Sequence, residues 1–391
     1  MQLSVRSWVA RSWVARSWAL VSLLTLLACR SNTEPQGQGA SGGDEQPRRA
    51  DRQEEQIAAP VRDDGTIFAD AEMMGTRVSI NLWIGGGDAV KATKAINDAM
   101  FEMARIESIA SEWRADTDLS RLNAHAGEGP QKVAPELVEI LARAREVSAD
   151  TGGLFDVSFY GVGQLWRFEP GAEPPSAEAI AERLPLVDWT KIEVDEQAHT
   201  AALAKAGMKV GLGAIAKGYA VDKAAALLRE RGFANFIVEG GGDTYVSGRK
   251  GDKDWRVGVQ DPKQTVGRVG YLVAEDQAVV TSGNYARFFV WDGVHYTHIL
   301  DPRSGWPIET QHSPKSVTLV AKDATTADAY CTAVSVMKPE QGLAFVEARP
   351  ALEAIIIGPD DQLLISSGLK SRFVDEREPS PPQNPEEPPQ P

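Results

Sequence analysis

The chain has 391 residues, of which 42% are hydrophobic and 25% are charged, so it is long enough for one or two domains with their own cores. Its net charge of −14 argues against nucleic acid as a partner, because an acidic surface repels the phosphate backbone. With only two cysteines the fold must depend on its hydrophobic core, and no repeat of about 20 to 50 residues indicates a solenoid or a propeller.

Residues 1–28 have the pattern of a targeting segment. Arginines occur early, and an apolar run from Ala19 to Ala28 then precedes Cys29. Such a run is typical of a secretory signal and is too short to span a membrane. The sequence Leu26-Leu-Ala-Cys29 resembles a bacterial lipoprotein signal, which implies a lipid on Cys29 and a location on the periplasmic side of a bacterial membrane. The alternative is an ordinary signal peptide whose cysteine is incidental.

Two further segments lack the large apolar side chains that a core requires. Residues 29–65 are rich in Gln, Gly, Pro, Ser and charge, and they predict a disordered tether. Residues 374–391 are rich in Pro and Glu and predict a disordered tail. The segment between them, residues 66–373, is therefore expected to form the globular domain.

Hydrophobic periodicity predicts both helices and strands in this domain. Residues 77–84 alternate as a strand, and apolar residues then recur at helical spacing over residues 90–109. A second helix is predicted over residues 135–149, with Gly152 placed to end it, and a third over residues 216–231. Later strands are expected at residues 236–239, 243–247, 255–260, 269–274, 278–282, 286–291, 295–300 and 316–321. The fold class is α+β, with mixed or antiparallel sheets and flanking helices.

A glycine-spaced turn at residues 211–222 opens the third helix. Glycines allow the backbone to approach a ligand closely, and the N-terminus of a helix favours negative charge. Lys217 adds an ammonium group in the first turn of that helix. The segment therefore predicts a site for a pyrophosphate, although a solvated helix lysine is the simpler interpretation of Lys217 alone.

The second half of this predicted site lies more than a hundred residues downstream. Asp328 and Thr332 are spaced i, i+4, so both oxygens project from one face of a helix. Mg²⁺ prefers oxygen ligands and takes one or two from the protein, with the rest from water and phosphate. The alternative is that Asp328 caps a helix and Thr332 packs in its interior.

Eight ordered motifs resemble those of one known family. They are Met74-Gly-Thr76, Ser120-Arg-Leu-Asn123, Thr151-Gly-Gly-Leu-Phe-Asp156, the turn at residues 211–222, Gly241-Gly-Asp243, Ser282-Gly-Asn-Tyr285, His298-Ile-Leu-Asp-Pro302 with Gly305 and Pro307, and Ala327-Asp328 with Thr332. In this order they resemble the ApbE-like FAD:protein FMN transferases, over about residues 67–370. The resemblance implies the ApbE-like fold, a T-fold-like arrangement.

The resemblance also implies an activity and a set of site residues. The activity is Mg²⁺-dependent transfer of the FMN half of FAD onto a Thr or Ser hydroxyl of an exported acceptor protein, with release of AMP. Carried over by position, the metal ligands are the Ala214 carbonyl, Asp328 and Thr332. The flavin contacts are Met74, Trp113, Leu154, Phe155, Asp156, Lys217 and His298. The chain departs from the family at Gly211, where an Asp is usual, and this puts flavin contacts there in doubt.

Two residues are candidates for catalysis. Lys217 is expected to neutralise pyrophosphate charge, because phosphoryl transfer asks a protein chiefly to position reactants and balance charge. His298 is the candidate general base for the attacking hydroxyl, since an imidazole titrates near neutral pH. Alternatively, His298 hydrogen-bonds only the flavin or a turn. Asp243 either orients the glycine turn or forms its own tight turn, and Ser282 and Asn284 are weaker candidates for contacts to acceptor or ribose.

Two other functions use the same residues. An FAD pyrophosphatase would hydrolyse FAD to FMN and AMP with the same metal and lysine. A non-catalytic flavin-storing lipoprotein would bind FAD without turnover. Lys217, Asp328 and Thr332 argue against mere storage, because binding alone does not need a cation at the pyrophosphate.

Overall fold

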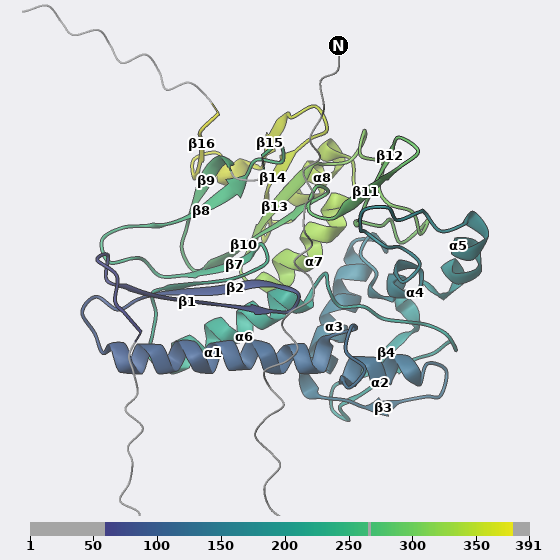
Figure 1. Ribbon diagram of the computed structural model, residues 1–391, viewed down its shortest axis with the longest axis horizontal. Helices are drawn as coiled ribbons and strands as arrows, with labels where there is room; N and C mark the ends of the chain where they lie inside the picture. Colours follow the sequence, from purple (N-terminus) through teal and green to yellow (C-terminus); the bar gives the residue numbers. More distant parts are fainter. Residues whose placement is uncertain (1–58, 265–266, 378–391) are drawn as a thin grey trace, which may run out of the picture. The chain divides into compact units, whose positions relative to one another are not determined.

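The computed structural model describes residues 59–264 and 267–377 (Figure 1). The predicted signal peptide, Cys29, and most of the predicted tether and tail lie outside the described residues. Within the part that is described, no helix has the length and apolar character needed to cross a bilayer.

The centre of the fold is an eight-stranded sheet in the order β1-β2-β6-β7-β10-β13-β14-β15. All its pairings are antiparallel. The strands are β1 (Thr66–Met73), β2 (Thr76–Trp83), β6 (Phe236–Gly240), β7 (Asp243–Ser247), β10 (Gln277–Gly283), β13 (Ser316–Ala321), β14 (Glu353–Ile357) and β15 (Leu363–Ile365). The strands follow one another in chain order, and β2 pairs directly with β6, so the N-terminal hairpin of β1 and β2 joins the strands of the second half in one sheet.

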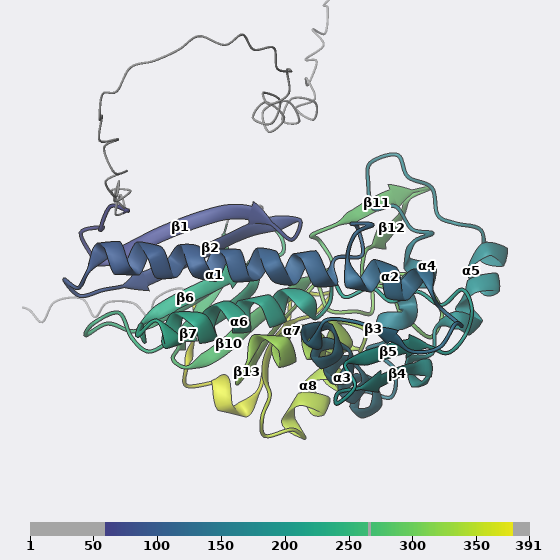
Figure 2. The ribbon, with the colours of Figure 1, turned by 90° about the horizontal axis from the view of Figure 1, so that it is seen from below.

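One face of the sheet is covered by α1 (Ala89–Ala110), α6 (Ala216–Glu230) and α7 (Ala324–Ser335) (Figure 2). Helix α1 begins where the Asp88 side chain accepts hydrogen bonds from the backbone N–H groups of Val90 and Lys91. Its apolar stripe, which includes Ile96 and Met103, is buried in the same core as the inward side chains of β2. Burial of such residues stabilises the domain, and truncating one to Ala typically costs about 2–5 kcal/mol.

The opposite face of the sheet packs on a small three-stranded sheet (Figure 1). That sheet consists of β8 (Trp255–Gln260), β9 (Arg268–Ala274) and β16 (Phe373–Asp375), in the order β16-β9-β8. Its buried side chains, such as Leu272, meet outward-facing residues of the central sheet such as Val279 and Ile355. The middle of the central sheet is therefore buried on both faces, which explains why β13 has no exposed residue, whereas β1 and β2 keep exposed residues.

The remaining elements lie beyond these layers. They are α2 (Asp118–Ala124), α3 (Pro135–Asp150), α4 (Tyr160–Gly163), α5 (Ala177–Arg183), α8 (Pro339–Glu347), the sheet of β3 (Gln131–Lys132), β4 (Ile192–Asp195) and β5 (Thr200–Leu203), the hairpin of β11 (Phe288–Trp291) and β12 (Val294–Thr297), and four short 3-10 turns. An aromatic cluster ties the hairpin to the α4–α5 region, with Trp166 packed against Phe168, Phe289, Tyr296 and Trp306.

The predicted α+β class is confirmed, and so are the long helices and most of the later strands. The strand predicted over residues 295–300 is too long: β12 ends at Thr297, so His298 lies just beyond it. Residues 59–65, assigned by composition to the tether, instead form a turn against α1, where the Ala59 N–H donates to Thr93. At the other end, β16 continues to Asp375, past the predicted start of the tail.

Candidate active site

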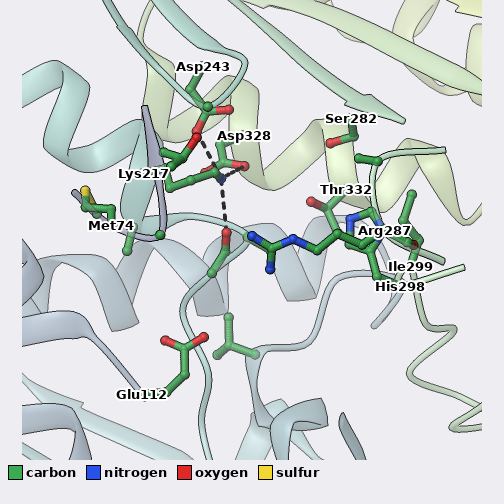
Figure 3. Close-up of a pocket in the computed structure, with 18 of the residues that line it drawn as sticks. Met74, Glu112, Lys217, Asp243, Ser282, Arg287, His298, Ile299, Asp328 and Thr332 are labelled. Atoms are coloured by element: carbon green, nitrogen blue, oxygen red, sulfur yellow. Dashed lines mark hydrogen bonds and ion pairs between the residues drawn. The ribbon is translucent and has the colours of Figure 1, made fainter. Parts of the chain in front are cut away.

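A cavity of about 850 Å³ lies where the N-terminus of α6, the β6–β7 turn and α7 come together (Figure 3). Its lining includes ten of the residues predicted from the sequence: Met74, Trp113, Leu154, Phe155, Asp156, Ala214, Lys217, His298, Asp328 and Thr332. Asp243 and Ser282 line it as well. Segments from both ends of the domain therefore contribute to one site.

Lys217 lies between two buried carboxylates. Its Nζ is 3.1 Å from Asp243 Oδ2 and 3.2 Å from Asp328 Oδ2, and it also donates to the Gly213 carbonyl at 3.1 Å. Burial by itself disfavours the ammonium charge, but the two carboxylates outweigh it and raise the pKa of Lys217 above its usual value. The lysine is therefore charged, and it is not a solvated surface residue.

Close packing of α6 on α7 sets this geometry. A Cβ at Gly218 would lie 2.3 Å from the Ala324 carbonyl oxygen, so only glycine allows the two helices to approach this closely. The Gly218 backbone N–H donates to Asp328 Oδ2 at 3.2 Å. Asp323, and not Asp328, is the N-cap of α7, so the carboxylate of Asp328 is free of a capping role.

Asp222 fixes the start of α7 from the second turn of α6. Its carboxylate accepts hydrogen bonds from the backbone N–H groups of Ala324 and Thr325, each at 2.8 Å, and from the Thr325 hydroxyl at 2.5 Å. Burial raises the pKa of Asp222 to about 6, despite these hydrogen bonds. The residue holds the position of Asp328 and Thr332 relative to Lys217, without reaching the cavity itself.

The donor set fits a magnesium ion. Asp243 Oδ2 is buried and accepts no hydrogen bond of good geometry, and Asp328 is equally buried. Burial and the neighbouring charge of Asp328 raise the pKa of Asp243 well above its usual value, which Lys217 only partly opposes. A single lysine leaves two adjacent carboxylates with an excess of negative charge, which a divalent cation would balance. Ala214 and Thr332 add a carbonyl and a hydroxyl along the same wall.

The predicted flavin contacts form another part of the lining. Met74 occupies the two-residue turn between β1 and β2 with φ of 54°, followed by Gly75 with φ of 68°, which is the left-handed pair of a type I′ hairpin. The Trp113 side chain is 81% exposed and meets Tyr160 edge to face. An exposed indole at the mouth of a cavity is available to stack on a planar ligand.

Asp156 lines the cavity, but its carboxylate is occupied by hydrogen bonds to neighbouring segments of the fold. One oxygen accepts hydrogen bonds from the backbone N–H and the hydroxyl of Ser158, at 2.8 and 2.6 Å, and the other accepts from the Trp189 N–H at 3.0 Å. Burial raises its pKa. Asn284 is also engaged in the fold, where it donates to the Pro314 carbonyl, and it is not part of the cavity lining.

His298 lies in the cavity wall as a neutral imidazole. Its Nδ1 is 3.1 Å from the Arg287 carbonyl oxygen, which can only accept, so Nδ1 carries the proton and Nε2 has the free lone pair. Burial lowers the pKa of His298 to about 4. The ring is therefore neutral at pH 7 with Nε2 unprotonated, and burial makes it a weaker base than an ordinary histidine.

Glu112 and Arg287 are among the cavity residues that the sequence did not indicate. Glu112 directly precedes Trp113, and Arg287 directly precedes the β11–β12 hairpin. A lone charged residue next to a predicted contact is usually solvated, so neither carried a signal of its own. The β11 strand also begins at Phe288 and not at residue 286, which leaves Arg287 in the loop that faces the cavity.

The departure at Gly211 has a steric reason. A Cβ at this position would lie 2.8 Å from the ring of Tyr160, so the aromatic ring fills the space that a side chain would need. The Gly211 backbone N–H donates to the Val157 carbonyl at 2.9 Å. The turn is thereby packed against the segment that carries Phe155 and Asp156.

Comparisons with known proteins identify the family of the chain. Residues 74–356 match the ApbE family. A Treponema pallidum protein named FAD:protein FMN transferase is 34% identical over 312 residues, which cover 74% of this chain and 86% of the relative. An Escherichia coli K12 protein of the same name is 29% identical over 304 residues, covering 75% of this chain and 86% of that protein.

Solved structures show the same fold. The ApbE protein of Thermotoga maritima superposes with a TM-score of 0.71 at 30% identity, covering 78% of this chain and 99% of that protein. The flavin transferase ApbE of Vibrio cholerae superposes with a TM-score of 0.68 at 29% identity, with the same coverage of 78% and 99%. The chain therefore belongs to the ApbE family, and it is a transferase.

Proposed function

We propose that this protein transfers the FMN half of FAD onto a Thr or Ser hydroxyl of an exported acceptor protein and releases AMP, with Mg²⁺ bound near Asp328. The observation that carries the proposal is the single cavity in which Lys217, Asp243 and Asp328 share a wall with Ala214 and Thr332. The names of the similar proteins support the same substrate and reaction.

Asp328, Thr332 and the Ala214 carbonyl are the residues that would hold the ion, with Asp243 beside them. When bound, Mg²⁺ neutralises pyrophosphate charge and makes the phosphorus more electrophilic. Lys217 contributes a positive charge that the two carboxylates keep in place. The N-terminus of α6 adds its dipole to the same end of the cavity.

The chemistry is a substitution at phosphorus. The acceptor hydroxyl oxygen forms a bond to the phosphorus of the FMN half, and the bond from this phosphorus to the bridging oxygen breaks, so AMP leaves with that oxygen. The hydroxyl proton passes to Nε2 of His298, whose Nδ1–H is held by the Arg287 carbonyl. Trp113 and Met74, which line the cavity, would contact the isoalloxazine ring.

The proposal includes a place in the cell. The run that ends at Cys29 supports export and lipid anchoring on the periplasmic side of a bacterial membrane. A Cys29→Ser variant should appear in the soluble fraction of the producing bacterium, whereas the unchanged chain should pellet with membranes. Equal distribution of the two proteins would contradict the anchor.

The experiment that tests the reaction is an acceptor mass assay. The protein is incubated with FAD, Mg²⁺ and a purified exported domain that carries an accessible Thr, with a parallel sample in EDTA. We expect the acceptor to gain the mass of FMN less water, together with one AMP, only in the sample with Mg²⁺. AMP with an unmodified acceptor would instead identify a pyrophosphatase, and FAD that stays intact for hours would identify a storage protein.

A further inference from the structure

One acidic side chain of the cavity has no part in the proposed chemistry. Glu112 follows the end of α1, and Figure 3 shows its carboxylate facing the cavity. Its Oε1 lies 3.3 Å from the position that a Cβ at Gly213 would take. The carboxylate is thus held against the glycine turn, close to Ala214 and away from the pair of Asp243 and Asp328.

The surroundings hold the carboxylate of Glu112 in place but leave part of its hydrogen-bond acceptor capacity free. Burial raises its pKa, whereas its own backbone N–H, the backbone N–H groups of Leu212 and Gly213 and the charge of Lys217 act in the opposite direction. A carboxylate has about four acceptor positions. Three backbone N–H groups therefore leave about one acceptor position, which the carboxylate can offer to a ligand in the cavity.

The position along the cavity indicates what Glu112 would bind. Its neighbour Trp113 is the predicted contact to the flavin ring, and the turn beside it carries Ala214, the predicted contact at the pyrophosphate. A ligand that reaches both must pass Glu112. In FAD this intervening part is the ribityl chain, whose hydroxyl groups are donors, whereas the pyrophosphate only accepts and would be repelled by a carboxylate.

We propose that Glu112 is a specificity-determining residue that accepts hydrogen bonds from the ribityl hydroxyl groups of FAD. The inference rests on the proposed function in taking FAD as the substrate. The inference also bears on Gly211, where the ring of Tyr160 leaves no room for the side chain that the family usually has. Glu112 brings a carboxylate to the same turn from another segment of the chain.

The test is a thermodynamic cycle of binding affinities. Dissociation constants are measured by flavin fluorescence, at fixed Mg²⁺, for the unchanged protein and for Glu112→Gln. The ligands are FAD and an FAD analogue whose ribityl chain is replaced by a chain without hydroxyl groups. Hydrogen bonds to a charged group are stronger than neutral ones, so we expect Glu112→Gln to weaken FAD binding roughly tenfold and the analogue hardly at all.

A matched control is available one turn earlier in the sequence. Glu107 also lies along the cavity, on α1, and Glu107→Gln makes the same change of charge. We expect Glu107→Gln to leave the ratio of the two dissociation constants unchanged. In turnover, Glu112→Gln should raise KM for FAD with kcat nearly unchanged, because the contact is present equally in the ground state and the transition state.

Two outcomes would overturn the inference. Equal weakening of FAD and the analogue by Glu112→Gln would mean that the carboxylate only supports the turn. Dissociation constants that both stay unchanged would mean that the carboxylate does not contact the ribityl chain. A protein that binds FAD but never modifies an acceptor would refute the proposed function, and the comparison of dissociation constants could still be made. Transfer to an acceptor, together with an equal effect of Glu112→Gln on FAD and on the analogue, would refute the inference about Glu112 and leave the proposed function standing.

Discussion

Lys217 shows how single residues define the chemistry of this site. Its ammonium group is held between Asp243 and Asp328, and burial of the two carboxylates makes the charges interact more strongly than at a surface. Removing one member of such a group leaves an uncompensated buried charge, which is more costly than the loss of a surface ion pair. Substitutions here should therefore preserve shape.

Asp328→Asn is the substitution that best tests the metal site. It keeps the volume of the side chain but removes the charge that would hold Mg²⁺, so transfer should fall by about 100-fold or more while the fold persists. The measurement is the initial rate of acceptor modification against Mg²⁺ concentration, with circular dichroism for the fold. Asp323→Asn is the control, because it changes the same charge on α7 and Asn is an equally good N-cap. Full activity in Asp328→Asn would contradict the assignment.

His298 should titrate well below an ordinary histidine. Burial lowers its pKa to about 4 in the folded protein, against about 6.5 in the unfolded chain. Between these values the unfolded state binds more protons, so the contribution of His298 to stability is present above pH of about 6.5 and is lost as pH falls towards 4. NMR of the imidazole C–H signals, assigned with His298→Gln, measures the midpoint. A midpoint near 6.5 in the folded protein would show that the ring is solvated.

At the scale of elements, the contact between α6 and α7 sets the site. Gly218 allows the helices to touch, and Asp222 binds the N-terminus of α7 from α6. These contacts hold Lys217 of one helix opposite Asp328 of the other. A shift of either helix would separate the two groups without any change in the residues that touch the substrate.

Gly218→Ala should disrupt this contact. The added Cβ would meet the Ala324 carbonyl at 2.3 Å, and backbone atoms cannot move aside as a flexible side chain can. We expect a loss of stability of about 3 kcal/mol, measured by urea unfolding, together with weaker FAD binding. Gly161→Ala is the matched control, because Gly161 lies in α4 and its nearest neighbour atom would be 3.9 Å from the new Cβ. Equal stability of both variants would argue against the close contact.

At the scale of the whole molecule, the described residues form a hydrophobic core on each face of the central sheet. The core between the sheet and α1, α6 and α7, and the core between the sheet and β8, β9 and β16, are formed by residues within 59–377. Within this range, the residues from Met74 to Thr332 that line the cavity come from both ends of the domain. The domain has therefore its own core and its own site.

A truncated protein of residues 59–377 should fold and bind FAD like the full chain. Its thermal unfolding midpoint should agree within about 2 °C, because no residue of either core is removed. Differential scanning calorimetry and flavin fluorescence measure these properties. A truncated protein that unfolds well below the full chain would show that the excluded segments contribute to the stability of the domain.

The sequence predicted the local parts of the fold and the site. The alternation of β2, the helical stripe of α1 and the glycine turn before α6 are all visible in short windows. The i, i+4 spacing of Asp328 and Thr332 likewise required only that α7 be a helix. These features depend on the spacing of apolar and polar residues within a short segment, so they can be predicted without knowing which other segments pack against it.

What the sequence alone determined, therefore, is which elements form and which residue types each of them carries towards a site. Only the tertiary structure decided that Asp243 meets Lys217, that the carboxylate of Asp156 serves the fold, and that Tyr160 fills the space beside Gly211. The physical reason is that these contacts join segments that are separated in the chain, so they depend on how the helices and the small sheet pack on the two faces of the central sheet.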